Sequence, residues 1–253
     1  MSFDTPQEHI DWAKTCIATA ESSFAAYVQN NAFSNVTEFD PKTGEKIIKV
    51  KLANPVPQMV SGTVRGALLD IKHSFDQSLF AAARIAGCAR FDKNYPWAET
   101  FFGTKGIIDK RQRKPESALP QFLVDEIFRQ QPYGTRPGFS GGDNLIRDMA
   151  RLVNDKHSIG FKVTASVTGM HIGKMTMSGG GSFFHGWDPV KEELIIAKLM
   201  PGGEISYQDC AMSADIFFKR AGDIGKVPVF AAAKIFADRA QFVLDGFKSA
   251  CGH

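Results

Sequence analysis

Residues 60–85 read VSGTVRGALLDIKHSFDQSLFAAARI, and this stretch decides how the rest of the chain is interpreted. Its apolar residues recur mostly at steps of three and four, as in a helix that buries one face. These residues are Val60, Val64, Ala67, Leu68, Ile71, Phe75, Leu79 and Ala82. Charged and amide side chains occupy other positions of the same stretch. We therefore expect a long central helix against which the remaining elements pack.

The composition is typical of a soluble globular protein. Of 253 residues, 43% are hydrophobic and 23% are charged, and the net charge of +3 is too small to attract nucleic acid by overall charge. No apolar run approaches the ~18 residues that cross a bilayer, and the acidic N-terminus is not typical of a signal peptide. The cysteines lack the spacing of a zinc site; they are Cys16, Cys88, Cys210 and Cys251. The sequence predicts a cytoplasmic protein with reduced thiols, no membrane contact, no metal and no cofactor.

The first part of the chain predicts a helix followed by a β-hairpin. Residues 5–8, TPQE, have the pattern of a capping box at a helix start. The helix that follows carries an apolar stripe, and the central helix is its expected partner. Residues 36–39 and 46–52 flank a turn with Pro and Gly at 40–44, as in a hairpin.

The middle of the chain contains aromatic residues without a sustained period, followed by a short basic run. Residues 90–103 therefore predict an ordered loop. The basic side chains after it are Lys110, Arg111, Arg113 and Lys114. Such a run beside a proline is usually a solvated loop, and the alternative is a patch that contacts phosphate.

The second half of the chain predicts two helices, several strands and a last helix. The helices are expected at residues 119–130 and 142–156, with a turn between them. The strands are expected at 161–167, at 170–177 as the hairpin partner of the first, at 194–200, and at 205–219 with an interruption near 210–213. A helix at 229–247 closes the chain.

This order of elements indicates an α+β fold in a single compact domain, residues 1–253. The helical part spans residues 1–157 and contains the inserted β-hairpin. The antiparallel sheet and the closing C-terminal helix span residues 158–253.

Polar residues of the central helix and of the 131–157 region form the candidate site. Lys72 and Asp76 are four residues apart on a helix, so we expect an ion pair. The other members of this polar cluster are Gln77, Gln131, Tyr133, Asp155 and Lys156. The cluster is interpreted either as a structural network or as the lining of a binding pocket.

Three short motifs resemble a family of uncharacterised bacterial proteins. They are the DIKHSFDQ of residues 70–77, Gln131-Pro132-Tyr133, and the NDKH of residues 154–157. The family reads N-L-R-S-A-L-D-H, Q-P-Y and D-K-H at the corresponding places. The central helix departs from the pattern, since Asp70, Lys72 and Gln77 replace Asn, Arg and His. The resemblance implies the same order of elements, and it implies no activity.

The Arg-x4-His spacing of that family is similar to the spacing in HEPN ribonucleases, which cleave RNA without a metal. There an imidazole moves the proton and a guanidinium neutralises the phosphate. In this chain the two positions hold Lys72 and Gln77, and an amide cannot act as an acid or base. Arg151 and His157 form a second, looser match and are the catalytic candidates of this reading.

The sequence thus leaves two functions open, and with them the question whether the protein is an enzyme. The first is a non-enzymatic cytoplasmic binding protein whose partner is a small molecule or a protein. The second is a HEPN-like, metal-independent RNase or RNA-binding protein. A homo-oligomer is compatible with both functions.

Overall fold

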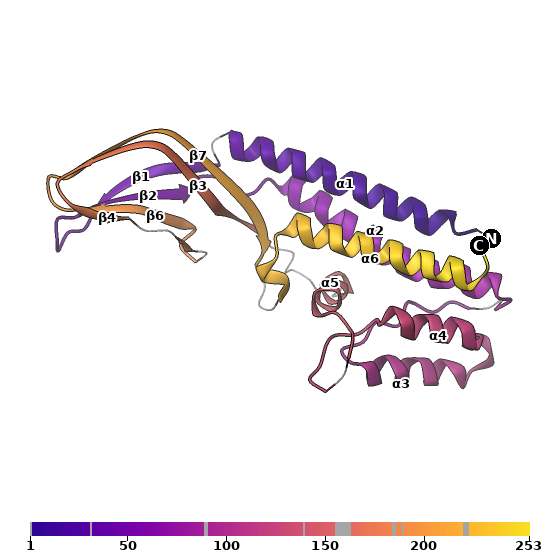
Figure 1. Ribbon diagram of the computed structural model, residues 1–253. Coiled ribbons are helices and arrows are strands. Elements are labelled where there is room, and N and C mark those ends of the chain that lie inside the picture. The colour runs from indigo at the N-terminus through magenta and orange to yellow at the C-terminus, as the bar shows by residue number, and fades with distance from the viewer. Residues whose placement is uncertain are drawn as a thin grey trace.

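The computed structural model describes residues 2–30, 32–88, 91–138, 140–154, 163–183, 186–188, 190–219 and 223–253. Within these residues the chain forms a helical body and a β arm that extends from one end of the body (Figure 1). The two termini lie together at the opposite end. The expected α+β fold is confirmed: helices and an inserted hairpin come first, then antiparallel strands and a closing helix.

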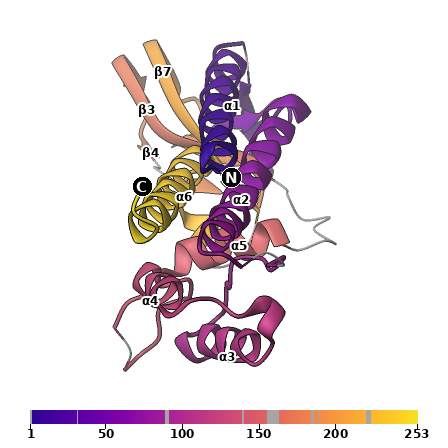
Figure 2. The ribbon, with the colours of Figure 1, turned by 90° about the vertical axis from the view of Figure 1, so that its right-hand side faces the viewer.

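Three long helices form the centre of the body: α1 (Asp4–Gln29), α2 (Gln58–Ile85) and α6 (Val229–Ala250). Every residue of the stripe predicted for the central helix is buried, and α1 packs against both α2 and α6. Figure 2 shows these helices nearly end-on, with the shorter helices α3, α4 and α5 beside them. None of the helices described has the length and apolar content that a membrane span requires.

Polar side chains of α1 and α6 contact each other. The amides of Gln7 and Gln241 hydrogen bond at 2.9 Å, and Lys234 lies 2.7 Å from a carboxylate oxygen of Glu21. These contacts join α1 and α6 at two places along their length.

The start of α1 differs from the predicted capping box. The helix begins at Asp4, its N-cap residue is Phe3, and no side chain caps it. The prediction for residues 5–8 was wrong because Thr5 already lies within the first turn. Phe3 is buried and packs edge-on against the ring of His253, with centroids 5.9 Å apart. An apolar contact therefore positions this end of the helix.

Helix α3 (Phe101–Gln112) begins within the loop expected at residues 90–103 and includes the start of the basic run, which is a correction. Thr100 caps it by accepting a hydrogen bond from the Gly103 N–H at 3.1 Å. The helix buries little, chiefly Thr104 and Ile108, so it lacks the apolar stripe that would have predicted it. A short 3-10 helix, η1 (Pro115–Ser117), follows it.

The remaining helices are α4 (Gln121–Gln130), α5 (Asn144–Asn154) and the 3-10 helix η2 (Asp223–Lys226), and the first two confirm the predictions at 119–130 and 142–156. Helix α4 approaches α6 closely at Gly246. A Cβ atom at Gly246 would lie 2.0 Å from Oε1 of Glu126 and 2.9 Å from Nε2 of Gln130. A larger residue at this position would therefore require the side chains of Glu126 and Gln130 to move.

The arm contains a five-stranded antiparallel sheet to which both halves of the chain contribute. Its strands are β1 (Phe33–Phe39), β2 (Lys46–Leu52), β6 (Glu193–Leu199), β4 (Gly181–Phe183) and β5 (Trp187–Asp188). Strands β1 and β2 form the predicted hairpin, and β2 pairs with β6. Strands β4 and β5 both pair with β6 on its other side. The hairpin near the start of the chain is therefore completed by a strand near its end.

The other part of the arm is a two-stranded antiparallel ribbon of β3 (Val163–Ser178) and β7 (Glu204–Phe218). Two predictions were wrong here: residues 170–177 continue β3 instead of folding back on it, and β7 is not interrupted at 210–213. The pairing of β3 with β7 is irregular at one place, where the register shifts between Val167 and Gly169 in β3. A Cβ atom at Gly169 would lie 2.5 Å from Oγ of Ser213. Gly169 thus allows close strand approach and does not mark a turn.

The sheet of the arm has one apolar and one charged face. The buried residues of β2 and β6 on the apolar face are Ile48, Val50, Leu194, Ile196, Ala197 and Leu199. The ribbon passes over this sheet (Figure 1) and contributes Ala165, Ile216 and Phe218 to the same hydrophobic core. The arm is therefore a two-layered structure that shares its core with the helical body.

Candidate functional site

The polar residues of the central helix tie it to the segment that follows. Nζ of Lys72 lies 2.8 Å from Oδ2 of Asp76, which confirms the expected ion pair, and both side chains are largely buried. Oδ1 of Asp76 accepts a hydrogen bond from the Tyr95 backbone N–H at 2.8 Å. Both oxygens of this carboxylate are thus engaged. Gln77, a predicted site residue, is exposed on the same helix.

A buried network continues from Tyr95 to α4 and α6. The Tyr95 hydroxyl donates to Oε1 of Gln130 at 2.8 Å, and the Gln130 amide donates to Glu126 at 2.6 Å and to the Val243 carbonyl at 3.2 Å. Burial raises the pKa of Tyr95, so its phenol stays neutral. Arg239 donates to the backbone carbonyl of Gln130. Apart from the Gln130–Glu126 hydrogen bond within α4, these contacts join one element to another, as in a structural network.

Gln131 and Tyr133, two of the predicted site residues, position the connection between α4 and α5. Gln131 adopts a left-handed conformation with φ of 52°, and its side chain accepts a hydrogen bond from the Gly142 N–H at 3.0 Å. Tyr133 is buried and packs edge-on against Phe101 at 5.6 Å. The structure does not bring Asp76 and Gln131 into direct contact: each forms hydrogen bonds of its own.

Gln130, which the sequence analysis did not single out, is the completely buried amide of this region. A signal for it existed, because Leu123, Ile127 and Gln130 follow the spacing of a single buried helix face. Three other predicted site residues, Asp155, Lys156 and His157, lie outside the described residues. Arg151 is exposed on α5. The role of the Arg151 and His157 pair stays a prediction.

The basic run belongs to the end of α3 and not to the expected loop. Lys110 and Arg111 lie in its last turn, Arg113 is its C-cap residue, and Lys114 follows. Cations at this end of a helix interact favourably with the helix dipole. Arg111 points inward and donates to the Asn94 carbonyl at 2.6 Å, and burial lowers the pKa of its guanidinium. Lys110, Arg113 and Lys114 are exposed.

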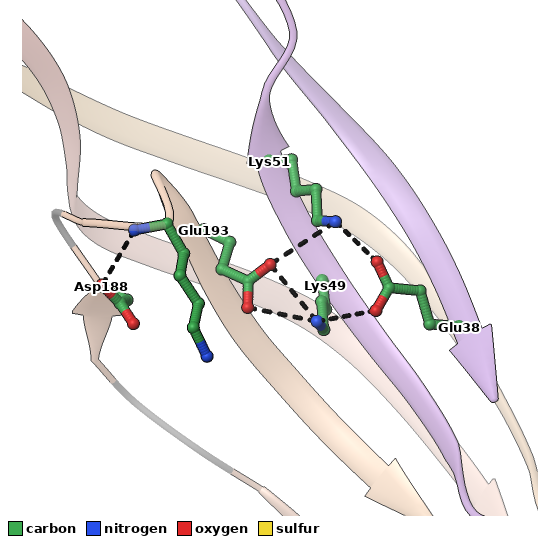
Figure 3. Close-up of polar contacts among 6 residues, drawn as sticks. Glu38, Lys49, Lys51, Asp188 and Glu193 are labelled. Atoms are coloured by element: carbon green, nitrogen blue, oxygen red, sulfur yellow. Dashed lines mark hydrogen bonds and ion pairs between the residues drawn. The ribbon is translucent and has the colours of Figure 1, made fainter. Parts of the chain in front are cut away.

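The charged face of the arm holds a network of two lysines and two glutamates (Figure 3). Lys49 lies between Glu38 at 2.8 Å and Glu193 at 3.1 Å, and Lys51 lies 2.6 Å from Glu38. Hydrogen bonds from both lysines lower the pKa of Glu38 to about 2. The same contacts raise the pKa of Lys49 and of Lys51. This neutral network joins β1, β2 and β6.

An open pocket of about 250 Å³ lies between the two layers of the arm. It is lined by Val167, Thr168, Gly169, Met170, Gly186, Trp187 and Leu194. Trp187 of β5 pairs with Leu194 of β6, and its ring lies edge-on to Phe33 at 5.9 Å. The indole Nε1 of Trp187 is buried and has no hydrogen-bond partner among the residues described. The pocket therefore combines apolar side chains with polar backbone groups, and one of its lining residues, Trp187, carries an uncommitted donor.

A second pocket, of about 360 Å³, lies between α1 and α6. Its lining includes Lys14, Lys234 and Asp238. Lys14 lies 3.9 Å from Asp238, and Lys234 pairs with Glu21, so these charges are already compensated. In the described part of the chain, no group of three or more His, Cys, Asp or Glu residues is arranged to hold a metal ion.

No protein-family model matches this chain, and no curated protein or solved structure is significantly similar to it. The resemblance to the bacterial family with the Q-P-Y and D-K-H motifs stays a prediction. The function has to be inferred from the geometry of this chain.

Proposed function

We propose that this protein is a binding protein whose ligand occupies the pocket between β3 and the β5–β6 edge of the sheet. The observation that carries this proposal is the buried Trp187 indole N–H without an acceptor among the described residues, on a side chain that lines an open pocket. An unpaired buried donor costs about 1–3 kcal/mol. Among the described residues, four side-chain atoms are of this kind, and Trp187 Nε1 is the one that belongs to a residue lining this pocket. A ligand with a hydrogen-bond acceptor would remove this cost.

The size and lining of the pocket define the class of ligand. A cavity of about 150 Å³ accommodates benzene, so the 250 Å³ here accommodate a ring with a small polar substituent. Val167, Met170 and Leu194 supply apolar contacts to such a ring. The ligand class is a small molecule with one ring and a carbonyl or similar acceptor, in keeping with the small-molecule partner expected from the sequence.

One further observation supports binding over catalysis, and another supports a cytoplasmic location. The carboxylates of Asp76 and Glu126 are occupied by hydrogen bonds, and the phenol of Tyr95 has a raised pKa, so the buried network offers no free acid or base. Cys16 and Cys88 are free thiols, as is Cys251, which fits a reducing compartment.

The experiment follows the indole N–H resonances of the protein during titration with benzamide, a ring with one carbonyl acceptor. The chain has three tryptophans, and Trp187→Phe assigns the resonance of Trp187. We expect benzamide to shift the Trp187 resonance and to leave that of Trp97 in place. Trp97 is a suitable internal control because its indole nitrogen is also buried without a partner among the described residues.

Ethylbenzene, which has no acceptor, provides the matched ligand control. Trp187→Phe should weaken benzamide binding about threefold to tenfold, as expected for one neutral hydrogen bond, and should leave ethylbenzene binding unchanged. If millimolar benzamide leaves the Trp187 resonance unmoved, or if Trp187→Phe affects both ligands alike, the proposed site is wrong.

A further inference from the structure

Strand β1 is the edge of the five-stranded sheet, and half of its backbone groups point away from the sheet. The Asp40 N–H donates to the Glu45 carbonyl, and the Ala53 N–H donates to the Ala32 carbonyl. In an antiparallel pair, residues bonded to the neighbouring strand alternate with residues whose N–H and C=O point the other way. The even-numbered residues of β1 therefore bond to β2. Its odd-numbered residues, Phe33, Asn35, Thr37 and Phe39, direct their N–H and C=O groups to the open edge.

This edge lacks most of the features that usually protect an edge strand from pairing. Such strands carry lysine, proline or a bulge, or are very short. Strand β1 has seven residues, FSNVTEF, pairs with β2 in continuous register and contains neither lysine nor proline. Phe39 at its end is 68% exposed. Within the described parts of the chain, no other strand covers the outer side of β1.

We propose that β1 pairs antiparallel with β1 of a second copy of this chain, about a two-fold axis at Val36. In this register Phe33 lies opposite Phe39 of the second copy, and Asn35 lies opposite Thr37. Phe33 and Phe39 of the two copies then exchange two backbone hydrogen bonds, as do Asn35 and Thr37. Val36 lies opposite Val36 of the second copy, in a pair without hydrogen bonds. All outward backbone groups of the strand become paired.

The side chains of the strand fit the same register. Glu38, the one charged residue of β1, lies opposite Ser34 of the second copy, so no like charges face each other. The Glu38 charge is already balanced by Lys49 and Lys51 within its own chain. A two-fold interface requires a surface that is complementary to itself, and this strand meets that requirement. An unrelated peptide would have to supply both aromatic partners independently.

The pairing would join the two sheets into one and extend the aromatic contacts of the arm. Phe33 lies edge-on to Trp187, which lines the pocket of the arm. Phe39 of the second copy would be the cross-strand neighbour of Phe33, at the Cβ separation at which aromatic pairs interact. The dimer does not rest on the proposed ligand, since the strand edge and the pocket are separate observations.

Oligomeric state and a crosslink together test the proposal. Sedimentation velocity over a range of concentrations should show a dimer for the unchanged chain. Thr37→Pro removes an N–H that points to the open edge and leaves the bonds between β1 and β2 intact, so it should give a folded monomer. Met59→Ser, at a residue of α2 that is 67% exposed, is the control and should remain dimeric.

Val36→Cys tests the register directly. Opposed residues in a pair without hydrogen bonds have Cα atoms ~4.5 Å apart, within the range that a disulfide spans. Mild oxidation should crosslink the Val36→Cys chains and should not crosslink Ser34→Cys chains, which the register places too far apart. The chain without substitutions, oxidised in the same way, is the control that shows how much crosslinking the native cysteines give. A monomer at all concentrations, or crosslinking of Ser34→Cys as efficient as that of Val36→Cys, would overturn the proposal.

Discussion

Gly246→Ala is the substitution for which the structure makes the sharpest prediction. Alanine usually stabilises a helix interior by about 1 kcal/mol relative to glycine. At this position, however, the added Cβ would lie 2.0 Å from Oε1 of Glu126, 2.7 Å from Nη2 of Arg129 and 2.9 Å from Nε2 of Gln130. These atoms must move, and the buried hydrogen bond between Gln130 and Glu126 would be strained or lost.

The size of the effect follows from these opposing contributions. Overpacking costs about 1–3 kcal/mol, and a hydrogen bond to a charged group contributes about 1.5–3 kcal/mol. After the gain in helix propensity, we expect Gly246→Ala to lower the free energy of unfolding by about 2–4 kcal/mol. The melting temperature should fall by about 4–16 °C, since 1 kcal/mol corresponds to about 2–4 °C for a domain of this size. Urea and thermal denaturation monitored by circular dichroism measure both quantities.

Two controls separate the close contact from any general effect of alanine. A Cβ atom at Gly106 in α3 would have no other atom within 4 Å, so Gly106→Ala should stabilise the protein by up to about 1 kcal/mol. In a Glu126→Ala background the main obstruction is gone, so Gly246→Ala should cost much less there than in the unchanged chain. A Gly246→Ala protein as stable as the unchanged chain would show that the side chains of Glu126 and Gln130 move aside without loss of their hydrogen bond, and would refute this prediction.

Two further predictions concern pH and the central polar residues. The pKa of Glu38 is about 2 in the folded chain against an ordinary value of 4.5, so its contribution to stability is present above pH 4.5 and lost as the pH falls toward 2. The difference in urea stability between the unchanged chain and Glu38→Gln should therefore shrink over this pH range, and a constant difference would contradict the ion-pair network. Asp76→Ala leaves Lys72 and the Tyr95 N–H without their partner and should lower the free energy of unfolding by about 1–3 kcal/mol, whereas Asp76→Asn keeps the acceptor for Tyr95 and should cost less. Equal losses in these two variants would show that the backbone hydrogen bond to Tyr95 contributes little.

The sequence predicted the elements that have strong periodicity and missed those that do not. The stripe of α2 and the Pro and Gly turn of the β1–β2 hairpin are local signals, and both elements formed as expected. Helix α3 buries mainly Thr104 and Ile108, too few apolar residues to show a period. Residues 161–167 and 170–177 were expected to be two strands of a hairpin, whereas β3 runs through both, and the close approach of Gly169 to Ser213 within it is invisible in the sequence.

The candidate site was harder to predict than the fold. The ion pair of Lys72 and Asp76 follows from helical spacing, but the second oxygen of Asp76 binds a backbone N–H, for which side-chain patterns give no signal. The pocket of the arm combines Met170, Trp187 and Leu194 from three strands, and their proximity depends on how the ribbon folds over the sheet. No local motif contains this information.

The pairing of β2 with β6 has a consequence for biosynthesis. Lys46 of β2 pairs with Leu199 of β6, so the hairpin leaves the ribosome long before its sheet partner is made. Until then its inner strand exposes Ile48 and Val50, which are buried in the finished protein. Such distant pairing slows folding and leaves an apolar strand open to aggregation. The nascent chain should therefore depend on chaperones most strongly between synthesis of the hairpin and arrival of β6.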